Sequence, residues 1–92
     1  MELLSDGDIR AELATLPDWT REGDAITATV KLADFRAAML YAGAVGYLAE
    51  QVNHHPDLLI QWNRVTLTLS THSAGGLTAA DFALARKISA LC

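Results

Sequence analysis

The chain has 92 residues, 51 % of them hydrophobic and 20 % charged, so it is expected to form one small domain over residues 1–92. Six glycines, two prolines and one cysteine exclude a disordered tail, a collagen-like rod and a disulfide scaffold. Eleven acidic against seven basic residues give a formal net charge of −4, and the lack of a basic run argues against a nucleic-acid partner.

The N-terminus and the apolar stretches bear on the cellular compartment. The first eight residues, MELLSDGD, have neither the basic start nor the long apolar region of a signal peptide. The longest stretch of low polarity, residues 37–49, is too short to cross a bilayer, which takes about 20 residues. The single cysteine, Cys92, has no partner for an intrachain disulfide. We therefore expect a soluble, cytoplasmic protein that does not bind membranes.

The first third of the chain predicts a helix followed by a hairpin. Ser5 followed by Asp8 resembles a capping box, and Pro17 ends the helical spacing of Ile9, Leu13 and Leu16. Residues 18–32 then contain a turn signature and an alternation of apolar and polar side chains, which predicts a β-hairpin. Its second strand is expected to turn four side chains toward the core: Ile26, Ala28, Val30 and Leu32.

The segment Phe35–Gln51 predicts a second helix, with Asp34 as its N-cap. Between residues 37 and 49 this helix carries almost no charge on any side, whereas a surface helix normally has one apolar stripe. One sheet can cover only one side of such a helix. We therefore expect the other side to meet a second subunit, in a homodimer or homotetramer formed through this helix and the sheet edges.

The remainder of the chain predicts two strands and a third helix. Residues 58–62 and 65–71 favour strands on either side of Asn63-Arg64, and residues 72–76 are expected to form a loop. Thr78 and Asp81 resemble a capping box before a helix with the buried stripe Phe82, Ala85, Ile88 and Leu91. The predicted fold is an α+β sandwich of order α-β-β-α-β-β-α, with a four-stranded antiparallel sheet and three helices on one face.

The candidate chemistry lies in three histidines. His54 and His55 follow the long helix and precede Pro56, which stiffens the segment, and His72 is expected at the end of the fourth strand. These three side chains could share a pocket and exchange protons near neutral pH. The alternatives are ordinary surface histidines or an open zinc site. Adjacent residues in extended chain point to opposite sides, and spaced ligand motifs are missing, so we expect no metal.

The motif EQVNHHP, residues 50–56, resembles the signature of the pterin-4a-carbinolamine dehydratases. The resemblance extends through LTLSTH and GLTAADFALA to the earlier PDWTREGDAI and KLADF, and thus covers residues 4–91. The signature positions in this chain are Glu50, His54, His55, Pro56, Trp62, His72 and Asp81. Two departures are Asn53, where many members carry Asp, and Leu58, where some carry an aromatic residue.

The resemblance implies dehydration of a 4a-hydroxytetrahydropterin to the quinonoid dihydropterin, without metal or organic cofactor. This reaction recycles the pterin for an aromatic amino-acid hydroxylase. The resemblance gives acid–base work to His54 and His72 and mainly substrate binding to His55. It implies a pterin pocket lined by Asn53, His54, His55, Ser70, Thr71, His72 and Ser73.

Four other side chains are candidates for a supporting role. Glu50 and Asp81 could orient the histidines, or could be ordinary acids at the end and the start of helices. Trp19 and Trp62 could stack on the pterin ring, and Trp62 could instead belong to the core. Family members also act as dimerisation cofactors of a transcription factor or assist the assembly of another enzyme. A binding module without catalysis is therefore the alternative function, although the intact histidine trio favours an enzyme.

Overall fold

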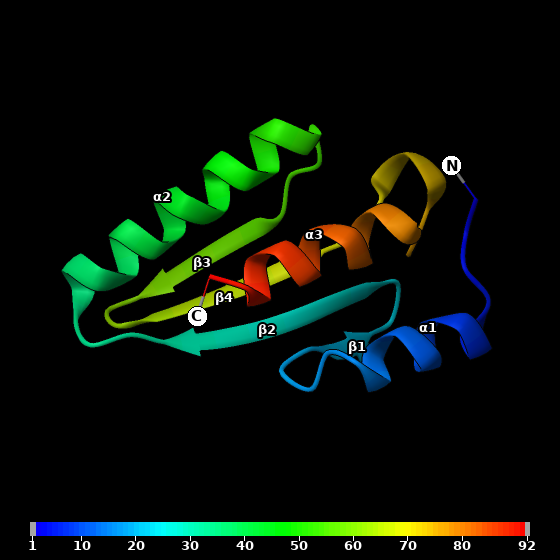
Figure 1. The fold of residues 1–92 in the computed structure, drawn as a ribbon, viewed down its shortest axis with the longest axis horizontal. Coiled ribbons are helices and arrows are strands. Elements are labelled where there is room, and N and C mark those ends of the chain that lie inside the picture. Colours follow the sequence, from blue (N-terminus) through cyan, green and yellow to red (C-terminus); the bar gives the residue numbers. More distant parts are fainter. Residues whose placement is uncertain (1, 92) are drawn as a thin grey trace.

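Three helices and four strands follow one another in the predicted order, with a short 3₁₀ turn, η1, before the last helix (Figure 1). A computed structural model describes residues 2–91. The elements are α1 (Asp6–Ala14), β1 (Thr20–Glu22), β2 (Ala25–Lys31), α2 (Phe35–Val52), β3 (Asp57–Gln61), β4 (Arg64–Leu69), η1 (His72–Ala74) and α3 (Ala79–Ser89).

The sheet is antiparallel throughout and has the strand order β1-β2-β4-β3. Its central pair runs from Ile26 opposite Leu69 to Lys31 opposite Arg64. Because side chains alternate across a strand, one face of β2 and β4 carries a buried apolar set and the other carries threonines. The buried set is Ile26, Ala28, Val65, Leu67 and Leu69.

The predicted caps begin the helices. The side chain of Ser5 accepts a hydrogen bond from the backbone of Asp8, and that of Asp34 accepts one from Ala37. Thr78 and Asp81 form the complete reciprocal box at the start of α3. These side chains satisfy amide groups that have no partner inside a helix, which explains why the local sequence places the helix starts correctly.

All three helices contribute to one core against the buried face of the sheet, as the sequence predicts. Ile9 comes from α1, Val45 and Ala49 from α2, and Phe82 and Ile88 from α3. Much of α2 lies outside this core: Phe35, Met39, Leu40 and Tyr47 are exposed within the single chain, as is Val52 at the end of the helix. No helix in residues 2–91 is both long and apolar enough to cross a membrane.

Several expectations for single residues need correction. Val30 and Leu32 are only half-buried at the margin of the core, and Leu91, expected in the buried stripe, is exposed. The fourth strand ends at Leu69, because Thr71 leaves the ladder to bridge Gly76. The predicted loop 72–76 therefore contains η1 and begins with His72. Pairing with a neighbouring strand, which propensity does not encode, decides where a strand ends.

Candidate functional site

The three histidines lie in segments at one end of the β3–β4 hairpin. Helix α2 ends at Val52, and the next residue, Asn53, takes a left-handed conformation with φ 49° and ψ 45° that turns the chain toward β3. Asparagine tolerates this conformation better than most residues, so the role seen for Asn53 is that of a C-cap. Asp57 pairs with Thr68, and this pairing brings the segment before β3 beside the segment after β4.

A cleft of about 400 Å³ lies at this end of the sheet. Its lining comes from the start of β2, the start of β3, the end of β4 and the loop beyond β4: Asp24, Ala25, His55, Asp57, Thr68, Ser70, His72 and Gly75. Thr68 alternates with the buried Leu67 and Leu69, so the cleft opens on the face of the sheet that carries no helix. Its volume is in the range of small-molecule sites.

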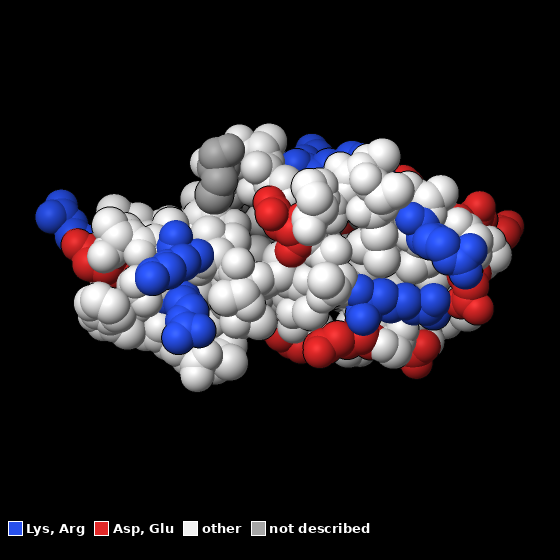
Figure 2. All heavy atoms as spheres, turned by 90° about the horizontal axis from the view of Figure 1, so that it is seen from below, with Lys and Arg blue, Asp and Glu red and all other residues white. Residues whose placement is uncertain are grey.

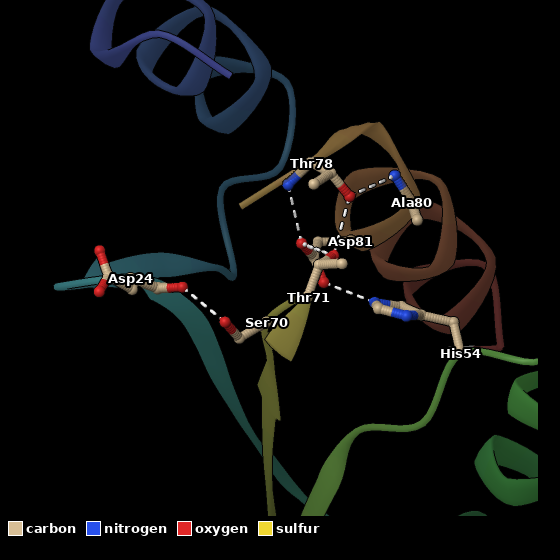
Figure 3. A network of polar contacts seen from close by, with 7 residues as sticks. All are labelled: Asp24, His54, Ser70, Thr71, Thr78, Ala80 and Asp81. Atoms are coloured by element: carbon tan, nitrogen blue, oxygen red, sulfur yellow. Dashed lines mark hydrogen bonds and ion pairs between the residues drawn. The ribbon is translucent and has the colours of Figure 1, made fainter. Parts of the chain in front are cut away.

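His55 and His72 thus share a cleft, whereas His54 turns toward the helix layer. The Nε2 atom of His54 lies 2.6 Å from Oδ1 of Asp81, and the His54 side chain is only 15 % exposed (Figure 3). The sequence expectation that adjacent residues point to opposite sides is therefore confirmed for this pair. The expectation of one pocket holds for two of the three histidines.

Asp81 is the centre of a buried polar network (Figure 3). Its carboxylate is fully buried and also accepts hydrogen bonds from the Thr71 hydroxyl, at 2.8 Å, and from the Thr78 backbone amide, at 2.9 Å. The hydroxyls of Thr71 and Thr78 lie 2.8 Å apart. The network joins three segments: the one that carries His54, the one that carries His72, and the start of α3. Asp81 therefore caps α3 and orients a histidine at the same time.

The contact with Asp81 has a consequence for the chemistry of His54. An ionised carboxylate can only accept hydrogen bonds, so Nε2 must carry a proton in this contact. In the neutral ring the lone pair then resides on Nδ1, which becomes the atom that can take up a proton. A buried, fully partnered carboxylate holds the ring in this tautomer and in one orientation.

His55 has an acidic partner of a different kind. Its Nε2 lies 2.5 Å from Oε2 of Glu50, in the last turn of α2. Both side chains are more than half exposed, so solvent weakens this pair and it contributes little to stability. Both acids that could orient a histidine thus do contact one, Glu50 on His55 and Asp81 on His54.

The remaining predicted site residues divide between the cleft and the interior. Ser70 lines the cleft, and its hydroxyl donates to the Asp24 carbonyl at 2.8 Å. Thr71 is buried in the network around Asp81. Ser73 and Asn53 are exposed beside the cleft without being among the residues that line it.

Neither tryptophan lies at the cleft. Trp19 is 3 % exposed and belongs to the core, where its indole N–H donates to the Ser89 hydroxyl at 3.0 Å. Trp62 is 66 % exposed in the β3–β4 turn, at the other end of the hairpin from His55 and His72. The proposed stacking of either ring on a substrate in this cleft is therefore corrected: Trp19 is core, and Trp62 is neither core nor cleft.

Five lining residues were missed from the sequence: Asp24, Ala25, Asp57, Thr68 and Gly75. Thr68 could have been found, because strand alternation places it on the face opposite Leu67 and Leu69. Asp57 follows the motif directly, and Gly75 lies in the predicted loop. Asp24 gives no local signal, since it enters the cleft through a contact with Ser70, 46 residues further along the chain. Among residues 2–91, no group of three or more His, Cys, Asp or Glu side chains is arranged to hold a metal ion.

The fold and the cleft define a class of small α+β proteins with a histidine-lined cleft at one end of the sheet. The family model described as pterin 4 alpha carbinolamine dehydratase matches residues 2–91. The chain belongs to the pterin-4a-carbinolamine dehydratase family, as the motifs predicted.

Relatives and solved structures agree with this membership. A Nocardia farcinica protein provisionally named pterin-4-alpha-carbinolamine dehydratase is 54 % identical over 90 residues, which cover 98 % of this chain and 95 % of the relative. A Thermomicrobium roseum protein with the same provisional name is 47 % identical, with coverages of 99 % and 98 %. The crystal structure of a transcriptional coactivator/pterin dehydratase from Brucella melitensis superposes with a TM-score of 0.91, at 34 % identity and 96 % coverage of both chains.

A more distant structure shares the fold alone. It is described as a pterin dehydratase-like protein that acts as a RuBisCO assembly factor in the alpha-carboxysome. It superposes with a TM-score of 0.64 at 19 % identity, over 79 % of this chain and 84 % of the other. The α-β-β-α-β-β-α sandwich is therefore confirmed, and it occurs in proteins with different described roles.

Proposed function

We propose that this protein is a cytoplasmic dehydratase that converts a 4a-hydroxytetrahydropterin to the quinonoid dihydropterin and water, with no metal or organic cofactor. The observation that supports it most is that His55 and His72, two signature histidines, line one cleft of suitable volume in a chain of this family. The third signature histidine, His54, is held by a buried carboxylate. The physiological role would be to recycle the pterin for an aromatic amino-acid hydroxylase.

The reaction needs two proton transfers. The C4a–O bond breaks as a general acid protonates the hydroxyl, which leaves as water, and a general base removes the proton from N5 as the C4a–N5 double bond forms. Histidine suits both tasks because it gains and loses protons near neutral pH. We assign the transfers to His72, in the cleft, and to His54, whose Nδ1 carries the lone pair when Asp81 holds Nε2. His55 mainly binds the ring.

A direct assay tests the proposal. A hydroxylase generates the 4a-carbinolamine, and its decay is followed by ultraviolet absorbance with and without the protein. We expect the protein to accelerate the decay. The substitution His54→Ala should reduce this acceleration more than His55→Ala does. No acceleration by the folded protein would overturn the proposal. A greater loss of catalysed rate in His55→Ala than in His54→Ala would exchange the roles of the two residues.

The exposed side of α2 supports a proposal about assembly. Phe35, Met39, Leu40 and Tyr47 form an apolar surface on a helix whose opposite side is already in the core. Large exposed apolar patches usually mark interaction sites. We propose that this surface packs against α2 of a second copy, so that two dimers form a homotetramer, and that sheet edges contribute to the dimers.

This assembly predicts the effect of one surface substitution. Leu40 is 67 % exposed in the single chain, so Leu40→Asp is expected to leave the fold intact and to reduce the oligomer to a smaller species. Light scattering at micromolar concentration measures the mass, with circular dichroism as the check on folding. A monomeric native protein, or an unchanged oligomer in Leu40→Asp, would contradict the assignment of this surface.

The alternative function is that of a binding module. The Brucella melitensis structure, described as a transcriptional coactivator as well as a pterin dehydratase, makes this the second candidate. The same apolar side of α2 would provide the docking surface. A folded protein that leaves the decay of the carbinolamine unchanged would favour this function.

A further inference from the structure

The permanently charged residues that line the cleft have one sign. Asp24 and Asp57 are the acidic residues that line it, and its lining within the described chain includes no lysine or arginine. Of the two histidines in the lining, His55 is already in contact with the carboxylate of Glu50, and His72 is the group to which we assign a proton transfer. A ligand in this cleft therefore meets two aspartates, and no permanently charged cation in the described lining balances them.

The backbone sets the two aspartates on opposite sides of the cleft. Asp57 begins β3, and Asp24 immediately precedes β2. Strand β4 lies between β2 and β3 in the sheet. Asp57 is held by its pairing with Thr68, and Asp24 by the hydrogen bond from the Ser70 hydroxyl to its carbonyl. Both contacts are with the end of β4, so Asp24 and Asp57 lie on the two sides of the cleft.

Arg21, the cation in strand β1, does not neutralise the charge of Asp24. Arg21 donates to the Gly23 carbonyl at 2.9 Å and to the Asp6 carboxylate at 2.8 Å. Its guanidinium is thus paired with α1 on the other side of the turn. Figure 2 shows acidic side chains to be more numerous toward the end of the molecule that carries α1 and the β1–β2 turn than toward the opposite end.

We infer that the cleft selects pterins whose side chain is uncharged and rejects those that carry a carboxylate or a phosphate. This inference rests on the proposed function, in which the cleft binds a pterin. The ring itself suits the two aspartates, because a 2-amino-4-oxopyrimidine presents N–H donors that carboxylates accept. An anionic substituent on the same ring would instead be placed among like charges.

Coulomb's law gives the size of the expected difference in affinity between an uncharged and an anionic pterin. A like charge about 8 Å away across a partly hydrated cleft costs on the order of a tenfold loss in affinity at low salt, and screening removes most of it when the Debye length falls to a few ångströms. The discrimination should therefore depend on salt, whereas the affinity for an uncharged pterin should depend on it little.

The test compares two stable pterins of nearly equal size, 6-hydroxymethylpterin and pterin-6-carboxylate, by calorimetric titration of the full chain at neutral pH. At low salt we expect the hydroxymethyl compound to bind at least about tenfold more tightly than the carboxylate. This difference in affinity should become smaller in about 0.5 M salt. Asp24→Asn and Asp57→Asn should each reduce the affinity ratio several-fold. Asp18→Asn, which removes an equal charge from outside the cleft, should leave the ratio unchanged.

The outcomes separate this inference from the proposed function. Equal binding of the two pterins by an active dehydratase would overturn the charge selection alone. The same holds if Asp18→Asn changes the ratio as much as the cleft variants do, because the effect would then come from net charge. Failure of both pterins to bind would overturn the inference together with the pterin site on which it rests.

Discussion

Replacement of His72 by alanine is expected to lower the rate of pterin dehydration by about 10²–10⁴-fold, the usual contribution of a well-placed general acid or base. His72 lines the cleft at the start of η1, and its side chain is exposed rather than part of the core. Its removal should therefore eliminate a proton-transfer group without disturbing packing. The measurement is the decay of the 4a-carbinolamine at equal enzyme concentration.

Two controls make the His72 result specific. The urea midpoint of His72→Ala should lie close to that of the native protein, because exposed substitutions usually change stability by less than about 0.5 kcal/mol. Lys87→Ala, on the exposed side of α3 and away from the cleft, should keep the native rate. A native rate in His72→Ala would remove His72 from the mechanism, and an equal loss in Lys87→Ala would point to a general defect.

Replacement of Asp81 by alanine is expected to lower the free energy of unfolding by about 2–4 kcal/mol, the usual combined loss when buried donors lose their acceptor and a helix loses its cap. The carboxylate is fully buried and has three partners: the His54 ring, the Thr71 hydroxyl and the Thr78 amide. The Thr71 and Thr78 donors would remain buried without this acceptor. The α3 capping box would be lost as well. Urea unfolding, with circular dichroism as the readout, measures the change.

Asp81→Asn provides the matched variant. It keeps the volume and one acceptor oxygen, so its loss of stability should be clearly smaller than that of Asp81→Ala. Dehydration should nevertheless slow, because the amide can no longer hold the His54 tautomer as the carboxylate does. If Asp81→Ala unfolds at the native urea concentration, the network does not stabilise the fold. Native activity in Asp81→Asn would limit Asp81 to the cap of α3.

Local physics explains which parts of the site could be read from the sequence. Helix starts are determined by side chains within three residues of the amides they satisfy, as at Asp34 and Thr78, and both were predicted. Side chains of neighbouring residues in extended chain point to opposite sides, which separates His55 from His54. The signature spacing located the histidines and both acids that contact them.

Long-range packing decided the rest, because a single sequence does not encode which distant segments meet. Asp81 contacts His54, which lies 27 residues earlier in the sequence. Asp24 lines the cleft because the β1–β2 turn contacts Ser70, which lies 46 residues later. The packing of distant segments also decided the positions of the tryptophans: Trp19 lies in the core and Trp62 in an exposed turn. The sequence by itself determined the order of the elements, the caps and the presence of the histidine motif, since these depend on neighbours along the chain. Only the tertiary structure decided which histidines share a cleft and which acids surround it, since those contacts exist only once the sheet has paired.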